Sequence, residues 1–546
     1  MSFPMNAIRN IALAGHGSTG KTTVVEQMLF NGNVITKAEK AGSGKTVSDY
    51  TEEEINRKIS IHTTFSNLVW KDRQINIFDT PGASDFVGEV VAGFRAAETG
   101  LMLVAAEAGV QIETLKLWRR LNGRNMPRIA FINKMDKERA NFDSCFEDLK
   151  DKFKIPMVPV TIPIGEGAEY TGIINLIENK AYMLPEEGGK EVPSDIPPEM
   201  HDRVEEYRLT LIESAAEGVD ELLEKYFEEG TLSEDDIRRG LNEGLKSNKI
   251  VPVLCGAAEL NSGLTSLLNF IANNAPSPEG HSEKAINGAD EESEVFYDSE
   301  KEASALVFKT SIDQFSGRLS YFKVVTGVIK PDSEYVNTSE SKKERVSKLY
   351  KTQGKKLTES KELYAGDIGI FSKVDSAKTN DTFCGPELAL KYEELQLPQP
   401  VHSVAISAES KKEEDKLNQF LHRAAEQDLT FQVKFNSETK ETVISCMGEL
   451  QLNIILDSIR EKGKIGIETR KPRIAYRESI TKPADAEYTH KKQSGGHGQY
   501  GRVVMEIKPI PRGEHMSFVN AIKGGSISKG YMPGIEKGIL EAMEEG

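Results

Sequence analysis

The sequence predicts a multidomain protein that opens with an α/β domain and continues through a β-barrel into smaller α+β domains. The chain has 546 residues, more than one hydrophobic core accommodates. Apolar strand-like runs alternate with helical runs over residues 1–280, as in a doubly wound parallel sheet. Short strands separated by Gly, Pro and Asp turns then follow.

Five apolar runs in the first domain are typical of buried parallel strands. They are residues 8–14, 75–78, 101–105, 129–132 and 250–254. Residues of about 158–248 show a different pattern of predicted elements, in which a strand-rich piece is followed by acidic helical segments. Because a strand resumes at residue 250, we predict an insertion within the first domain.

The rest of the chain divides at polar and Pro-rich stretches. Residues 280–302, rich in Ser, Glu and Asp, are predicted to be a linker. A small β-barrel is predicted for residues 303–396 and an α+β domain for 401–478. Residues 482–546 form Gly-rich strands and turns that end in a helix, and we interpret them as a partial domain.

Composition limits the class of protein. The formal net charge is −16, which does not favour non-specific nucleic-acid binding, although a local basic patch can act alone. Four cysteines without CxxC spacing argue against a zinc site and fit a reducing cytoplasm. No run approaches the ~20 apolar residues of a membrane span, and no signal peptide is apparent. We expect a cytoplasmic protein without a membrane partner.

A phosphate-binding motif, GHGSTGKT, stands between the first strand and the next helical run. Backbone N–H groups and the helix N-terminus can hold phosphates there. Lys21 would neutralise the β- and γ-phosphates, and the Thr22 hydroxyl would bind Mg²⁺. The predicted phosphate-binding residues are Gly15, His16, Gly17, Ser18, Thr19, Gly20, Lys21, Thr22 and Thr23.

A second motif, DTPG, ends the strand at residues 75–78. It consists of Asp79, Thr80, Pro81 and Gly82. A carboxylate at a strand end can hold Mg²⁺ directly or through water. Gly82 has no side chain that would keep its N–H from the γ-phosphate.

A third motif, NKMD, specifies the base. It consists of Asn133, Lys134, Met135 and Asp136. The Asp136 carboxylate can accept hydrogen bonds from N1 and N2 of guanine, and adenine lacks this donor pair, so the motif favours GTP over ATP. Backbone contact to the guanine O6 would come from Gly256, Ala257 and Ala258, after another strand.

Basic and aromatic side chains meet on a Gly-rich loop near the end of the chain. They are Lys491, Lys492, His497, Tyr500 and Arg502. Such groups suit contact with an RNA backbone and stacking on bases. The alternative is a hairpin with solvated charges.

The ordered motifs resemble those of translational GTPases, and the later segments are similar to the elongation factor G family. Residues 317–331 and 343–350 resemble its second domain, a β-barrel. Residues 447–460 resemble its third domain, and residues 493–503 and 530–543 resemble the start of its fourth. The resemblance covers essentially the whole sequence. It implies a GTPase domain with an inserted subdomain, a β-barrel, a ferredoxin-like α+β domain and a partial domain IV.

Members of this family are ribosome-dependent GTPases that move tRNA and mRNA. The resemblance therefore implies GTP or GDP with Mg²⁺, a monomer that binds rRNA and ribosomal proteins, and contact with the tRNA–mRNA region through domain IV. The resemblance also implies that Ser60 is a metal ligand together with Thr22 and Asp79. The segment RKISI stands where the family has RGITI, and serine keeps the hydroxyl of the threonine that it replaces. Residues 52–54, three glutamates in the same switch segment, are interpreted as a solvated helical face.

The departures from the family spare nucleotide binding and concentrate on hydrolysis. Ala83 stands where the family has the histidine that orients the attacking water, so no catalytic residue is identified. Such groups contribute ~10²–10⁴-fold to the rate. Ser18 replaces an aspartate, Ala257 a serine and Gln451 a histidine. We therefore expect a divergent second paralogue that binds GTP and hydrolyses it slowly.

The family continues beyond the position that matches Gly546, so we expect a C-terminally truncated chain.

Two alternative functions stay open. The nearest one is ribosome recycling or ribosomal protection. An alternative of another class is a non-catalytic, GTP-dependent switch that acts away from the ribosome.

Overall fold

The structure is a computed structural model that describes residues 3–184, 189–313, 316–476, 478–494, 497–522 and 524–545. The chain divides into two compact units. The first unit consists of Met1–Ser403, Ala408–Val433 and Ile444–Ile467, and the second of Val404–Ser407, Lys434–Val443 and Glu468–Gly546. The limits of the four predicted domains stay predictions.

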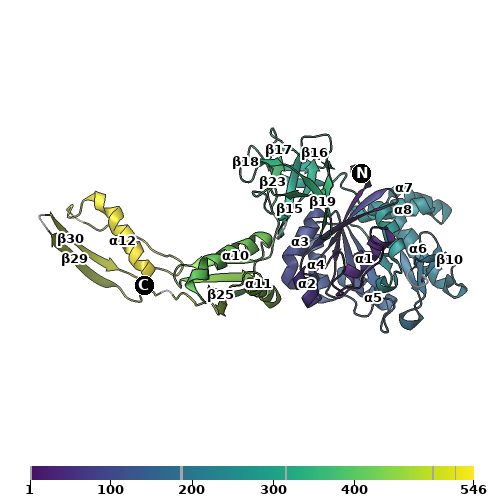
Figure 1. Cartoon of the computed structure of the whole chain (residues 1–546), viewed down its shortest axis with the longest axis horizontal. Coiled ribbons are helices and arrows are strands. Elements are labelled where there is room, and N and C mark those ends of the chain that lie inside the picture. The colour runs from purple at the N-terminus through teal and green to yellow at the C-terminus, as the bar shows by residue number, and fades with distance from the viewer. Residues whose placement is uncertain are drawn as a thin grey trace. The chain divides into compact units, whose positions relative to one another are not determined.

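A seven-stranded sheet lies among the helices of the N-terminal part of the first unit (Figure 1). Its strand order is β2-β3-β1-β4-β5-β11-β6. All neighbours are parallel except β2 and β3. The strands are β1 (Ile8–Ala14), β2 (Thr64–Trp70), β3 (Arg73–Asp79), β4 (Thr99–Ala105), β5 (Arg128–Asn133), β6 (Met157–Pro159) and β11 (Val251–Cys255). The predicted runs correspond to β1, β3, β4, β5 and β11. The sequence did not reveal the edge strands β2 and β6, because β2 is partly polar and β6 is short.

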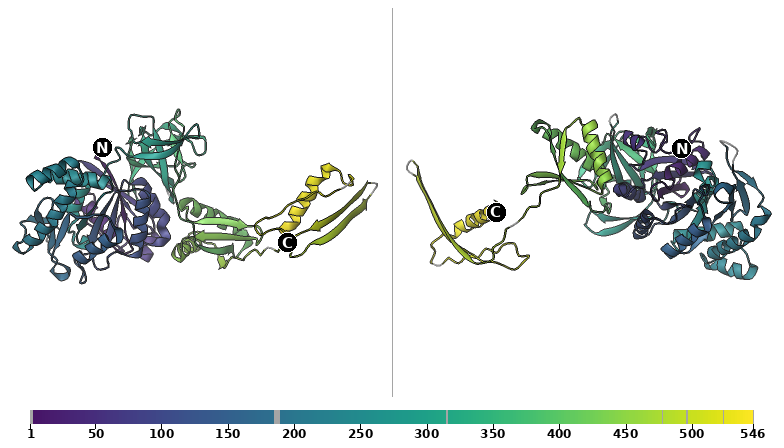
Figure 2. Two further views of the ribbon diagram at one scale, coloured as in Figure 1. Left: turned by 180° about the vertical axis from the view of Figure 1, so that it is seen from behind. Right: turned by 90° about the horizontal axis from the view of Figure 1, so that it is seen from below.

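Helices cover both faces of this sheet (Figures 1 and 2). They are α1 (Lys21–Asn31), α3 (Val87–Ala96), α4 (Ile112–Gly123), α5 (Phe142–Phe153) and α9 (Leu264–Asn274), and the short α2 (Glu52–Arg57) precedes β2. Covering both faces buries all seven residues of β1 and of β4, which explains their continuous apolar character. The predicted α/β fold class is confirmed.

Between β6 and β11 the chain leaves this sheet and forms a second one, in the order β10-β9-β8-β7. Its strands are β7 (Thr161–Ile164), β8 (Gly172–Asn175), β9 (Lys180–Met183) and β10 (Val192–Ser194), and the helices α6 (His201–Ala216), α7 (Asp220–Glu229) and α8 (Glu234–Lys246) follow. Helices α6 and α8 approach closely at Gly240. A Cβ on this residue would lie only 2.1 Å from the Ala215 carbonyl oxygen, so the position requires glycine.

The prediction of a linker at residues 280–302 was wrong. Strands β12 (Ser282–Asn287) and β13 (Glu292–Phe296) form a sheet with β24 (Leu390–Tyr392), in the order β13-β12-β24. The acidic composition suggested an exposed segment, but Glu283 is buried in an ion pair with Arg95 of α3. The Tyr297 hydroxyl also donates to Glu283 at 2.7 Å. Charges that are neutralised in this way can be buried in a strand.

An eight-stranded antiparallel sheet, with the small β16–β21 pair, forms the predicted barrel. Its order is β18-β17-β23-β14-β15-β22-β19-β20. The strands are β14 (Ser304–Asp313), β15 (Gly317–Thr326), β16 (Val328–Ile329), β17 (Ser333–Asn337), β18 (Lys342–Val346), β19 (Leu349–Gln353), β20 (Lys356–Ser360), β21 (Leu363–Tyr364), β22 (Ile368–Ser372) and β23 (Thr382–Cys384). Phe322 and Phe371 stack in its core with ring centroids 3.8 Å apart.

Polar and aromatic contacts attach the barrel to the GTPase sheet. Lys323 of β15 forms a buried ion pair with Glu98, which also accepts a 2.8 Å hydrogen bond from the Asn10 side chain. At the edge of the sheet, the Gly354 N–H donates to the Phe65 carbonyl oxygen at 2.9 Å. The rings of Phe65 and Tyr321 stack beside this bond. The barrel therefore adds a backbone hydrogen bond to the β2 edge.

The last part of the first unit contains α10 (Glu414–Gln427) and α11 (Glu449–Glu461). The four-stranded sheet β26-β27-β25-β28 contains residues of both units. Its strands are β25 (His402–Ala408), β26 (Gln432–Asn436), β27 (Glu441–Cys446) and β28 (Ile467–Arg470). Two helices with one such sheet agree with the predicted α+β fold.

The second unit ends with a long hairpin and a helix, which are β29 (Ala484–Ser494), β30 (His497–Ile507) and α12 (Met532–Glu545). Within this unit the buried carboxylate of Glu441 pairs with Arg470 and Arg473. In the part of the chain that the structure describes, no helix is long and apolar enough to cross a membrane.

The buried pair between Lys323 and Glu98 yields a stability prediction. We expect Lys323→Met to lower the free energy of unfolding by about 3–5 kcal/mol, because Glu98 would stay buried without its counterion. The double variant Glu98→Gln/Lys323→Met should regain most of this loss. Chemical denaturation measures both. Lys343→Met, in an exposed pair with Glu334, is the control and should cost less than about 1 kcal/mol. Equal losses for Lys323→Met and Lys343→Met would contradict the prediction.

Candidate nucleotide-binding site

The phosphate-binding loop lies between β1 and α1, at the carboxyl edge of the sheet. Lys21, at the start of α1, is buried and donates hydrogen bonds to the carbonyl oxygens of Gly15 and His16, at 2.9 and 3.2 Å. Burial lowers the pKa of Lys21 to about 8, although the carboxylates of Asp79 and Asp49 oppose this shift. A bound phosphate would add negative charge and favour the protonated ammonium.

The loop needs residues that tolerate a tight backbone. Gly20, the residue before α1, has φ +95°, and a Cβ there would lie 2.4 Å from the Asn133 side-chain nitrogen. Ser18 also has a positive φ, 64°, and its side chain is exposed. A serine in this conformation carries a local strain that glycine would not. The Nδ1 atom of His16 is buried and has no hydrogen-bond partner among the described residues.

Asn133, at the end of β5, connects three loops. Its side-chain nitrogen donates to the Thr19 carbonyl oxygen at 2.9 Å, and its side-chain oxygen accepts from the Ala258 N–H at 3.0 Å. The phosphate loop is thereby fixed to the loop after β11. In addition, the Met135 N–H donates to the Gly256 carbonyl oxygen at 3.2 Å.

Asp136, the residue predicted to recognise guanine, follows Met135 in the same loop. Its Oδ2 atom is 2.8 Å from the Lys137 ammonium, which also pairs with Glu259 at 2.7 Å. Hydrogen bonds to both carboxylates raise the pKa of Lys137. A carboxylate has about four acceptor positions, so the pair with Lys137 leaves capacity for the N1 and N2 groups of guanine.

The predicted metal ligands converge beside Lys21. The hydroxyl oxygens of Thr22 and Ser60 are 3.3 Å apart, which places the switch segment against the start of α1. Both carboxylate oxygens of Asp79 are buried, and among the described residues neither has a hydrogen-bond partner. Burial raises the pKa of Asp79, and the neighbouring Ser48 and Lys21 side chains oppose this shift. Two hydroxyls and an unpartnered carboxylate form a donor set that fits Mg²⁺, which prefers oxygen ligands.

Sequence reasoning missed Asp49, which lies beside this donor set. One of its carboxylate oxygens is buried and unpartnered among the described residues, as is the Ser48 hydroxyl. Burial, and then the Asp79 carboxylate, raise the pKa of Asp49 to about 7. A divalent cation would relieve the repulsion between the two carboxylates. Asp49 stands in a polar segment without any motif, so only the fold identifies it.

The interpretation of residues 52–54 as a solvated face was wrong for Glu54. This side chain is 1% exposed. It closes a capping box with Thr51 and accepts hydrogen bonds from the Ile61 and His62 N–H groups, both at 3.0 Å. The backbone turns back over α2 after Lys58, and unpaired N–H groups there require an acceptor. Glu54 therefore shapes the segment that carries Ser60.

Comparisons with known proteins agree with this geometry. The chain matches the family models described as elongation factor Tu GTP binding domain (residues 6–277), elongation factor G domain 2 (302–385), elongation factor G domain III (397–471) and elongation factor G domain IV (472–546). The chain belongs to the elongation factor G family. As a member of this family, it is a GTP-binding translation factor whose GTPase domain is of the type that hydrolyses GTP.

One solved structure also resembles this chain over nearly its whole length. It is the crystal structure of ttk003000868 from Thermus thermophilus, with a TM-score of 0.85 and 29% sequence identity. The match covers 98% of this chain and 78% of that chain. The likeness therefore extends beyond the GTPase domain to the elements that follow it.

The DTPG loop lies against the loop of residues 15–22. A Cβ on Gly82 would lie 2.6 Å from the Lys21 ammonium nitrogen and 2.8 Å from the Gly17 backbone nitrogen. This close approach requires glycine. Ala83 follows, half-buried and extended at φ −90° and ψ 138°. Its methyl group offers no hydrogen-bonding atom to a water molecule near the phosphates.

Asp85, two residues further, connects the DTPG loop to α11. Its Oδ2 atom accepts hydrogen bonds from the Leu450 and Gln451 N–H groups, at 2.9 and 3.3 Å. A carboxylate at a helix N-terminus is stabilised by these free N–H groups and by the helix dipole. Gly448 makes the approach possible, because a Cβ there would lie 2.4 Å from Asp85 Oδ2. Gln451, the position where the family has histidine, belongs to the same contact.

The RNA-contact candidates lie on the β29–β30 hairpin of the second unit. Lys491 pairs with Tyr500 across the hairpin, so these two side chains share a face with Arg502, and Lys492 lies on the opposite face. Arg502 forms an ion pair with Glu487. The side chain of His497 lies outside the described residues. Lys491 and Tyr500 are thus the candidates that can act together, and their role in RNA contact stays a prediction.

The donor set around Asp79 yields a prediction about Mg²⁺. We expect Asp79→Asn to raise the Mg²⁺ concentration that supports half-maximal binding of a GTP analogue by about 10–100-fold, because a charged oxygen donor is lost. Titration of a fluorescent GTP analogue with Mg²⁺ measures the change. Asp72→Asn, at the exposed turn between β2 and β3, is the control. An unchanged Mg²⁺ requirement in Asp79→Asn would exclude this role.

Proposed function

We propose that this protein is a ribosome-associated GTPase of the elongation factor G type that binds GTP with Mg²⁺ and hydrolyses it slowly. The observation that carries the proposal is the assembly of the four predicted loops at one sheet edge. Asn133 ties the phosphate loop to the base-binding loops, while Ala83 directly follows the DTPG glycine on the side of α3. The site is equipped to hold the nucleotide and lacks, at this position, a side chain that positions water.

Each part of the site has a separate task in this proposal. Backbone N–H groups of residues 15–20 and the Lys21 ammonium would bind the phosphates. Asp136 would select guanine. Thr22, Ser60 and Asp79 would hold Mg²⁺, with Asp49 nearby, and the ion would offset the negative charge of the phosphates. Ala83 itself has no group that can act as a general base.

Partner contact follows from the family rather than from the nucleotide site. We propose that the ribosome is the partner and that the face of the β29–β30 hairpin with Lys491 and Tyr500 contacts RNA. Tyr500 is 70% exposed, as a stacking platform must be. Lys491 can pair with phosphate at the same face.

Co-sedimentation tests the ribosomal proposal. We expect the protein to pellet with ribosomes in the presence of a non-hydrolysable GTP analogue and much less with GDP. In the Asp136→Asn variant, pelleting should no longer depend on the guanine nucleotide that is added. The reason is that an amide presents a donor to the N1 and N2 groups of guanine, which are donors themselves. Failure of the wild-type protein to pellet with the analogue would favour the GTP-dependent switch away from the ribosome. Conversion of the ribosomes to subunits in the same assay would favour recycling.

Slow hydrolysis is tested at Ala83. We expect Ala83→His to raise the single-turnover rate of GTP hydrolysis on ribosomes by ~10²–10⁴-fold, since it supplies a group that can orient water. Ala83→Leu adds volume without a hydrogen-bonding atom and should not raise the rate. Both variants should bind the GTP analogue like the wild type. A wild-type rate equal to that of a histidine-bearing homologue would contradict the proposal.

A further inference from the structure

Three successive backbone N–H groups follow Ser60, and two buried carboxylates hold all of them. Glu54 of α2 accepts from Ile61 and His62, each at 3.0 Å. Glu89 of α3 accepts from Thr63 at 2.6 Å. Glu54 belongs to the switch segment itself, whereas Glu89 belongs to the helix that follows the DTPG loop. Glu89 is therefore the carboxylate that attaches this backbone to the body of the domain.

A second bond strengthens the attachment at Glu89. The Thr63 hydroxyl donates to the Glu89 backbone carbonyl oxygen at 2.7 Å, so one residue of α3 holds Thr63 through two atoms. Nδ1 of His62 also lies 3.5 Å from Glu89 Oε1. Three residues of extended chain span at most roughly 11 Å, so fixing Thr63 restricts where Ser60 can lie. In this arrangement the Ser60 hydroxyl is 3.3 Å from the Thr22 hydroxyl.

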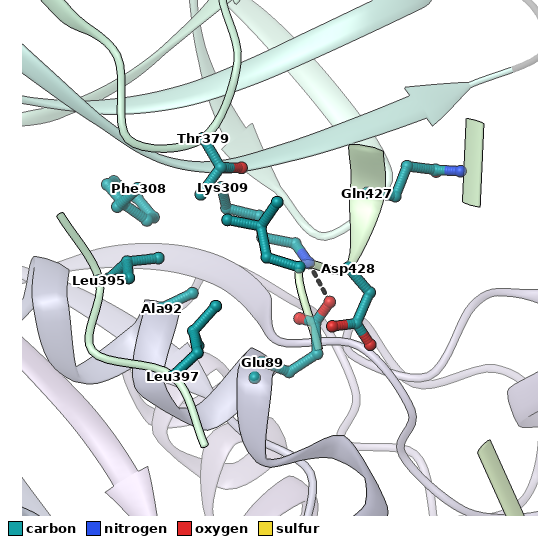
Figure 3. A pocket seen from close by; sticks show the side chains of 11 residues that line it. Glu89, Ala92, Phe308, Lys309, Thr379, Leu395, Leu397, Gln427 and Asp428 are labelled. Carbon is teal, nitrogen blue, oxygen red and sulfur yellow. Dashed lines mark hydrogen bonds and ion pairs between the residues drawn. The ribbon is translucent and has the colours of Figure 1, made fainter. Parts of the chain in front are cut away.

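The counterion of Glu89 comes from the barrel. Figure 3 shows Lys309 of β14 reaching between Glu89 and Asp428, with an ion pair to Glu89. Both members of the pair are buried, with side-chain exposures of 7% and 8%. Burial alone would raise the pKa of Glu89, but Lys309 and His62 outweigh it and lower the pKa to about 2. The carboxylate is thus ionised and can accept strong, charge-assisted hydrogen bonds.

Asp428 faces the same group from the end of α10. Its Oδ1 atom accepts from the Thr430 N–H and hydroxyl, at 2.9 and 2.6 Å, and its Oδ2 atom accepts from the Gln451 side chain at 2.6 Å. These bonds satisfy Asp428 locally. Lys309 therefore serves Glu89, the carboxylate that binds the switch backbone.

We propose that Glu89 is a positioning residue for the triphosphate state, which anchors the Ser60 segment to α3 with Lys309 of the barrel as its counterion. The inference rests on the proposed function, since Ser60 can favour GTP over GDP only if it reaches Mg²⁺ at the γ-phosphate. Its consequence is that Lys309, a residue of the barrel outside the nucleotide-binding motifs, affects how well GTP is distinguished from GDP.

Nucleotide preference tests the proposal. The double variant Glu89→Leu/Lys309→Met removes the acceptor for the Thr63 N–H without leaving an unpaired buried charge. We expect its affinity for a non-hydrolysable GTP analogue, relative to GDP, to fall by about tenfold or more, the effect of one lost charge-assisted hydrogen bond. Fluorescent nucleotide titration with saturating Mg²⁺ measures both dissociation constants.

The chain offers a matched control, the second buried pair between barrel and GTPase sheet. Glu98→Gln/Lys323→Met removes charges of the same kind, but here the carboxylate accepts from the Asn10 side chain rather than from the backbone that follows Ser60. Its GTP-to-GDP preference should stay within about twofold of the wild type, which is a small free-energy difference. An equal change in both double variants, or an unchanged preference in Glu89→Leu/Lys309→Met, would overturn the proposal.

Hydrogen–deuterium exchange on the wild-type protein keeps the test decisive if the double variant does not fold. The peptide that contains Thr63 should be protected with the GTP analogue and Mg²⁺ and exchange faster with GDP. Identical protection in both states would overturn the proposal. If the wild type binds no guanine nucleotide at all, the proposed function fails instead, and the two failures are distinguishable.

Discussion

The side-chain amide of Asn133 is the contact on which the nucleotide site depends. A parallel sheet brings the ends of β1, β3, β5 and β11 to one edge, but it does not fix the loops that follow them. Asn133 does so by donating to Thr19 and accepting from Ala258. An aspartate could not donate and a leucine could do neither, so the amide is the group that both bonds require.

Two buried charge pairs fix the barrel against the GTPase domain within the first unit. Glu98 with Lys323 and Glu89 with Lys309 each join the GTPase sheet or its helices to the barrel. Such pairs contribute little net stability compared with apolar contacts, because desolvation offsets the attraction. They do penalise any other docking, since a displaced barrel would leave charges buried without partners. The barrel is thereby fixed in one register against the switch segment.

Most of the fold could be predicted from the sequence, and the motifs of the candidate site could be located in it, although the roles of their residues stay predictions. Strand runs such as residues 8–14 and motif residues such as Lys21 and Asp79 carry local signals, namely continuous apolar character and fixed spacing. Asp49 and the strand β12 carry none, and Glu54 carries only the Thr51–Glu54 capping-box spacing, which predicts a helix start and not burial. Their side chains look like surface acids until a hydrogen-bond donor or Arg95 meets them in space. Burial of a charge depends on partners far away in the sequence, which composition and periodicity cannot reveal.

The bond between Gly354 and Phe65 has a practical consequence for studying the parts of this protein. Strand β2 is the edge of the seven-stranded sheet, and the barrel hairpin satisfies part of its backbone and covers Phe65 with Tyr321. A GTPase fragment expressed without the barrel would expose an unpaired edge next to an aromatic ring, a combination that invites strand-to-strand aggregation. Poor solubility of such a fragment would then reflect the missing neighbour rather than a defect in its own core.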